Sequence, residues 1–144
     1  MAALKESPSR TQITRHDCVE GWSAIGKWTG VPIGDLMHQV EPLPNARYAV
    51  IHCADEDDEG VAYYESIALA DCYHPQTILA YELNGAPLDV PHGAPLRLRF
   101  ERQLGYKQAK YVMRIELVES FFGIGGGKGG YWEDGAGYEW YAGI

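Results

Sequence analysis

GYKQAKYVMRIELV, residues 105–118, joins a basic loop to an apolar segment and decides the fold. The apolar content of residues 111–118 predicts a strand. In the loop before it, Gly105 permits close backbone approach, and Lys107 and Lys110 lie three residues apart. Backbone N–H groups and ammonium groups together bind phosphate-like anions well, although an ordinary solvated basic turn has the same spacing. The stretch therefore predicts a strand that follows a candidate anion-binding loop.

A rigid turn precedes this loop. Residues 90–97 read VPHGAPLR, in which proline and glycine restrict the backbone so that His92 and Arg97 are presented at set angles. A plain corner with a surface arginine is the alternative. Residues 96–100 alternate with a period of two, which places Arg97 and Arg99 on the face opposite the leucines.

The remaining elements are short and strand-dominated. The predicted strands are residues 12–18, 48–53, 77–83, 86–90, 96–100 and 111–118, with Asn84-Gly85 as a hairpin turn. The predicted helices are residues 31–37, with Pro32 in the first turn, and residues 66–73. This mixture predicts the α+β class.

The length of 144 residues predicts one domain. Residues 1–10 are expected to be a linker or frayed start, and residues 11–122 the domain itself. Residues 123–144 are rich in glycine and aromatic residues and are expected to pack back onto the domain. Their glycine run is not expected to bind a dinucleotide, because no helix is predicted after it. The acidic run at residues 55–60 predicts a solvated surface loop.

Composition argues against several classes of protein. The formal net charge of −8 argues against a nucleic-acid partner, and no apolar run is long enough for a membrane span. Three cysteines without CxxC spacing argue against structural zinc and leave one disulfide with one free thiol open. The first residues carry no export signal, so we expect a cytoplasmic location for the chain as given and a periplasmic one if a longer protein carries such a signal.

Cys18 lies in TRHDCVEGWS, residues 14–23, directly after a predicted strand. Neighbouring positive charge favours the thiolate form of a cysteine, and a soft thiolate suits a transition metal. A buried cysteine that serves only as a small apolar side chain is the alternative. Cysteine protease chemistry would require a histidine positioned by the fold.

Taken in order, the segments CVEGWS, HGAPLR and GYKQAK resemble the molybdopterin-binding domain of the sulfite oxidase superfamily, in particular its bacterial branch. The resemblance runs from about residue 11 to about residue 118. It implies a strand-rich sulfite-oxidase-type molybdopterin-binding fold. Because the family carries a long stretch upstream of the cysteine segment, the chain would be the C-terminal portion of that fold, an N-terminally truncated member.

The resemblance also implies a cofactor, molybdenum-molybdopterin, with Cys18 as the metal ligand and a catalytic residue. Arg15, expected to be a second catalytic residue, and Trp22 are placed at the substrate pocket by their proximity to Cys18. The family's cofactor contacts correspond here to Cys53, His92, Arg97, Lys107, Gln108, Ala109 and Lys110. The reductase branch has asparagine where His92 stands.

The activity implied is oxygen-atom transfer on a small substrate of the sulfite or sulfoxide type. No CxxCH heme motif is present, so electrons are expected to pass to a separate partner, such as a heme protein. A non-catalytic truncated remnant that acts as a binding or structural module is the alternative.

Overall fold

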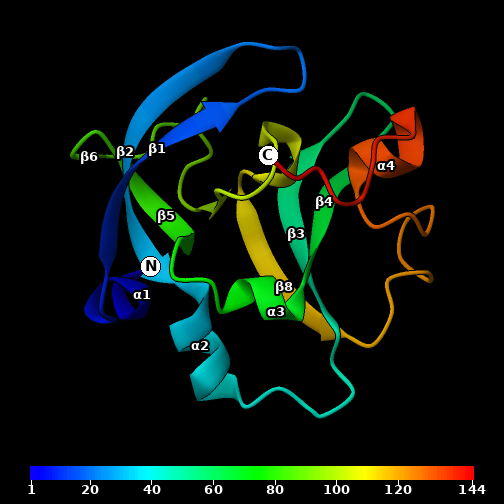
Figure 1. Ribbon diagram of the computed structural model, residues 1–144, viewed down its shortest axis with the longest axis horizontal. Helices are drawn as coiled ribbons and strands as arrows, with labels where there is room; N and C mark the ends of the chain where they lie inside the picture. Colours follow the sequence, from blue (N-terminus) through cyan, green and yellow to red (C-terminus); the bar gives the residue numbers. More distant parts are fainter.

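The computed structural model describes residues 1–144 and contains two antiparallel sheets with short helices (Figure 1). The strands are β1 (Arg10–Asp17), β2 (Ser23–Pro32), β3 (Tyr48–Glu56), β4 (Ala62–Ala68), β5 (Thr77–Leu83), β6 (Ala86–Pro87), β7 (Arg97–Phe100) and β8 (Val112–Val118). The helices are α1 (Ala2–Glu6), α2 (Ile33–Val40), α3 (Leu69–Cys72), the 3₁₀ turn η1 (Gly105–Lys107) and α4 (Tyr131–Ala136). None of these helices is long and apolar enough to cross a membrane. The strand-rich α+β prediction is confirmed.

The first sheet has the order β1-β2-β5-β6, with β7 also paired to β5. The second has the order β4-β3-β8. β1 and β2 form a long hairpin in continuous register from the Arg10–Gly30 pair to the Asp17–Ser23 pair. This hairpin arches over the molecule in Figure 1 and carries the Cys18 turn at its end.

The main core brings together residues from both sheets and from α2, among them Ile33, Ile51, Ile67, Leu98 and Phe100. All five side chains are essentially inaccessible to solvent. Full burial of an aliphatic or aromatic side chain contributes about 1.5–3 kcal/mol, so this cluster is a major source of stability. The core cluster holds β7 in place, and β7 borders the candidate functional site.

The predicted alternation along β7 is present. Leu98 and Phe100 join the core, whereas the guanidinium groups of Arg97 and Arg99 lie over the Trp28 ring, 4.9 and 4.3 Å from its centroid. Both arginines are buried, so the face opposite the leucines is not a solvated surface. Cation–π contact stabilises this arrangement.

Two segment predictions are wrong in part. Residues 66–73 are not one helix, because β4 runs through Ala68 and α3 begins only at Leu69. Pairing of β4 with β3 overrides the local helical pattern. The first ten residues contain the short helix α1, and Arg10 already belongs to β1.

Within residues 123–144, the part around Gly130 and α4 lies beside β4, an edge strand of its sheet (Figure 1). An isolated bridge joins Glu65 to Gly130, and the Ser66 hydroxyl donates to the Gly129 carbonyl at 2.5 Å. The prediction that no helix follows the glycine run is wrong, since α4 begins at Tyr131. Asp134 in α4 accepts hydrogen bonds from the backbone of Gly126 and Lys128, which secures the run to the helix.

Candidate functional site

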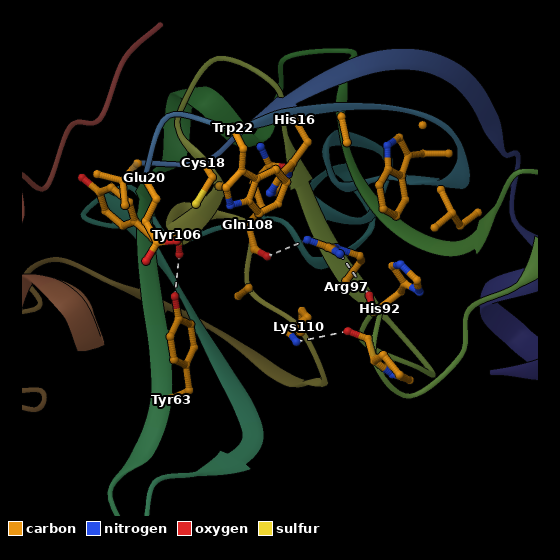
Figure 2. Close-up of a pocket in the computed structure, with 18 of the residues that line it drawn as sticks. His16, Cys18, Glu20, Trp22, Tyr63, His92, Arg97, Tyr106, Gln108 and Lys110 are labelled. Carbon is orange, nitrogen blue, oxygen red and sulfur yellow. Dashed lines mark hydrogen bonds between the residues drawn. The ribbon is translucent and has the colours of Figure 1, made fainter.

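A cavity of about 660 Å³ lies between the β1–β2 hairpin, β7, the loop that contains η1, and the C-terminal segment. Its volume is within the range of small-molecule and cofactor sites. Figure 2 shows Cys18, Trp22, Arg97, Gln108 and Lys110 around this one space. The segments that line it are distant in sequence, so the fold assembles the cavity.

A tight turn delivers Cys18 to the cavity. Its backbone N–H donates to the Trp22 carbonyl at 2.9 Å, and the Gly21 N–H donates to the Cys18 carbonyl at 2.9 Å. Gly21 has a φ of 92°, a conformation that glycine adopts at little cost. Cys18 is a free, half-buried thiol, and its side chain is therefore available to a ligand.

Arg97 is a buried cation without a carboxylate partner. It is 7% exposed, and its Nη1 and Nη2 donate only to the carbonyls of His92, at 3.0 Å, and Gln108, at 3.4 Å. Burial and the neighbouring Arg99 lower the pKa of Arg97 to about 10. An unpaired buried charge is costly, so this arginine indicates an anionic ligand.

Arg99, two residues on, is fully paired. It forms an ion pair with Glu101 at 2.6 Å and donates to His16 Nδ1 at 2.9 Å. Burial, followed by the charges of Arg99 and Arg97, lowers the pKa of His16 to about 4. His16 is therefore neutral near pH 7, and because Nδ1 accepts a hydrogen bond its proton is on Nε2.

We expect His16 to make folding stability depend on pH. In the unfolded chain it binds a proton below about pH 6.5, whereas in the folded protein it does so only near pH 4. The unfolded state therefore binds more protons between these values, and the free energy of unfolding falls as pH falls through the window. His16→Asn keeps an acceptor for Arg99, and urea unfolding from pH 7 to 4 should show a flatter profile than the wild type. His38→Asn, a change at an exposed histidine, is the control; equal slopes for His16→Asn and wild type would contradict the assignment.

Four buried polar atoms at the cavity have no hydrogen-bond partner in the protein: Trp28 Nε1, Asp55 Oδ1, Arg97 Nε and Gln108 Oε1. Buried polar atoms are rarely left unsatisfied, and here two donors and two acceptors share one cavity. Burial also raises the pKa of Asp55. The set indicates a ligand that offers both hydrogen-bond donors and acceptors.

Most residues singled out by the sequence line this cavity. They are Cys18, Trp22, His92, Arg97, Gln108, Ala109 and Lys110. His92 is exposed and bonded through Nδ1 to Asp89 at 2.5 Å, while its carbonyl accepts from Arg97. Lys110 donates to the Pro91 carbonyl at 3.2 Å.

Three others lie elsewhere. The Arg15 side chain is 67% exposed and paired with Asp17 at 2.8 Å, outside the cavity lining. Cys53 belongs to the core, where burial raises the pKa of its thiol to about 12. Lys107 is fully buried against Glu65 and Glu133.

Sequence reasoning missed His16, Trp28, Asp55 and Tyr63 as lining residues. His16 could have been found from the sequence. Along the predicted strand, its side chain points to the same face as that of Cys18, whereas the side chain of Arg15 points to the opposite face. Asp55 was assigned to the solvated acidic loop, but β3 extends through it and half-buries it. Tyr63 donates to the Tyr106 carbonyl at 2.5 Å, a contact that only the fold could reveal (Figure 2).

Several known proteins are similar to this chain in sequence or in fold. The family described as oxidoreductase molybdopterin binding domain matches residues 1–122. The putative protein-methionine-sulfoxide reductase subunit YedZ1 of Azospira oryzae is 43% identical over 140 residues, 97% of this chain and 48% of that protein. The protein-methionine-sulfoxide reductase catalytic subunit MsrP of Xanthomonas axonopodis pv. citri is 36% identical over 125 residues, 81% of this chain and 39% of that protein.

Among solved structures, the sulfane dehydrogenase SoxCD from Paracoccus pantotrophus superposes with a TM-score of 0.72 at 20% identity. That match covers 83% of this chain and 34% of the other, and shows the same fold. The chain thus spans less than half the length of each of these three proteins.

Proposed function

The chain belongs to the oxidoreductase molybdopterin-binding domain family, and on this basis we propose that its cavity holds molybdenum-molybdopterin for oxygen-atom transfer. The proposed substrate is a small sulfoxide or sulfite-type group. The observation that carries the proposal is Arg97, a buried cation without a carboxylate, in the same cavity as the free thiol of Cys18.

The residues present fit this cofactor. A cysteine thiolate is a soft donor suited to molybdenum, and Arg97 and Lys110 supply positive charge for a phosphate group. The pterin ring system carries both hydrogen-bond donors and acceptors, which is what the unpartnered atoms of Trp28, Asp55 and Gln108 require. The family's matched region includes all of these positions.

When bound, the cofactor supplies a metal that changes by two electrons as an oxygen atom is transferred. The role of the chain itself is to bind and orient the cofactor. Cys18 would hold the metal, while Arg97, Gln108 and Lys110 would hold the pterin and its phosphate. Neutral His16 keeps its Nε2 proton as a donor at the cavity wall. The partly exposed Trp22 also lines the cavity and would restrict the entry of water there.

The names of the relatives support the choice of substrate. Two are called protein-methionine-sulfoxide reductase subunits, so we favour a sulfoxide, which would be reduced. A reduction needs an electron donor, and the description of both relatives as subunits supports a separate electron-transfer partner such as a heme protein.

Metal analysis tests the proposal. Protein purified from a host that makes the cofactor is expected to contain about one molybdenum per chain, since a built site retains its metal. Arg97→Met should retain roughly tenfold less, because a charge-assisted hydrogen bond to phosphate is lost. The control, Arg102→Met, alters an exposed arginine that pairs with Asp71 outside the cavity, and should retain the wild-type amount.

Molybdenum that is absent from folded wild-type protein would overturn the proposal and favour a non-catalytic module. Equal losses in Arg97→Met and Arg102→Met would show that Arg97 has no specific role. Inductively coupled plasma mass spectrometry, with circular dichroism to confirm folding, separates these results.

A further inference from the structure

The C-terminal segment, residues 123–144, borders the cavity although it lies beyond the matched family region, which ends at residue 122. Trp132 and Tyr138 line the cavity, and their rings stack with centroids 5.8 Å apart. The segment therefore forms part of the wall of the candidate site.

The same segment clamps the start of the cofactor loop, residues 103–110. The Leu104 N–H donates to the Ala142 carbonyl at 2.9 Å, and the Ala142 N–H donates to Gln103 Oε1 at 3.1 Å. The Tyr106 hydroxyl donates to the Glu139 carbonyl at 2.7 Å. These bonds join two parts of the chain that are more than thirty residues apart in sequence.

A buried ionic cluster completes the clamp. Lys107 Nζ lies 2.5 Å from Glu133 Oε1 and 2.6 Å from Glu65 Oε2, and all three side chains are fully buried. Only the contact with Glu133 has hydrogen-bond geometry; the Glu65 contact is close in distance alone. Lys107 is thus directed at the α4 carboxylate.

Charge balance explains why two glutamates surround one lysine. Burial is the largest cause that raises the pKa of Glu65 well above its ordinary value, and the Glu133 charge acts in the same direction. Glu65 also faces the Tyr63 hydroxyl at 3.4 Å. With Glu65 protonated, the Lys107–Glu133 pair is electrically neutral, which a water-free site requires.

We propose that Glu133 is a positioning residue, through which the C-terminal segment holds the cofactor loop in its ligand-binding shape. This rests on the proposed function, since the loop is the one assigned to the cofactor. The connection is short: Glu133 fixes Lys107, and Lys107 directly precedes Gln108, whose carbonyl accepts from Arg97. A shift of Lys107 therefore moves an anchor of the buried cation in the cavity.

Trypsin provides a direct readout, because it cleaves after lysine and Lys107 is inaccessible in the folded protein. Glu133→Ala is expected to speed cleavage after Lys107 about tenfold or more, since loss of a buried partner favours local opening. Molybdenum content should fall in parallel. Glu133→Gln should restore protection, because the amide still accepts from Lys107 while Glu65 gives up its proton and supplies the charge.

Two controls accompany these variants. Glu139→Gln removes the same charge from an exposed position of the same segment and should behave as wild type. If Glu133→Ala fails to fold, Tyr106→Phe tests the clamp more gently, because it removes only the partly exposed bond to the Glu139 carbonyl. It should speed cleavage after Lys107 by about threefold, a change typical of one lost hydrogen bond.

The outcomes separate the two proposals. Wild type that retains molybdenum, with Glu133→Ala unchanged in both cleavage and metal content, overturns the positioning role and leaves the function intact. Cleavage that rises equally after Arg47, which lies outside the loop, shows a merely structural role and also overturns it. If wild type binds no molybdenum, the proposed function fails, yet selective cleavage after Lys107 still supports the clamp.

Discussion

Replacing Cys18 by serine is expected to lower turnover of a sulfoxide substrate at least a thousandfold, a loss typical of removing a group that acts directly at the reacting centre. Serine is close in size, but its hydroxyl is a hard donor and stays protonated near pH 7, so it cannot replace a soft thiolate at molybdenum. Molybdenum retention should also fall. The backbone bonds of the Cys18 turn need no thiol, so the thermal midpoint should change little.

Three measurements check this expectation: steady-state turnover of the complete protein with its electron donor, molybdenum per chain, and thermal unfolding. The matched control is Cys72→Ala, which removes a buried thiol of the core that is not part of the cavity lining. This variant should be less stable than the wild type but should have the same turnover per folded molecule. Full turnover in Cys18→Ser would rule out this cysteine as the metal ligand.

Lys107→Met is expected to produce the largest loss of stability, about 3–5 kcal/mol, because it leaves a buried carboxylate without its partner. This is a large share of the roughly 5–15 kcal/mol that stabilises a domain. Methionine can occupy the space of the lysine chain near Trp140, so lost charge pairing, not lost volume, causes the effect. Urea unfolding of the metal-free protein at pH 7 measures it.

Burial already raises the pKa of Glu65, so the charge that Lys107→Met leaves without a partner is that of Glu133. Lys128→Met is the control, because Lys128 is an exposed lysine of the same C-terminal segment. It should stay within about 0.5 kcal/mol of wild type, as surface changes usually do. A Lys107→Met protein as stable as this control would show that the cluster contributes nothing to folding.

Local patterns predicted the strands of the two sheets well where side chains alternate or form apolar runs, as in β3, β7 and β8. They did not predict β2, whose Gly26 and Gly30 interrupt the pattern. A Cβ on Gly30 would collide with the Leu79 backbone, so this glycine allows β2 and β5 to approach closely. That requirement comes from pairing between distant segments, which no local pattern contains.

The residues of the candidate site were likewise predicted only in part. The segments that resemble the family placed Cys18, His92, Arg97 and Lys110 together, and the structure brings these four to one cavity. Lys107 was assigned to the cofactor because it lies next to the segment that the resemblance matches to the cofactor's phosphate loop. Its burial depends on Glu133, twenty-six residues away in a segment whose helix was not predicted.

The continuous pairing of β1 with β2 has a consequence for how this protein can change in length. Successive side chains of a strand point to opposite faces, so adding or deleting one residue within β1 would turn either His16 or the core-facing Gln12 outward. Insertions and deletions that natural variation tolerates should therefore occur mainly between α2 and β3, outside the hairpin that carries Cys18.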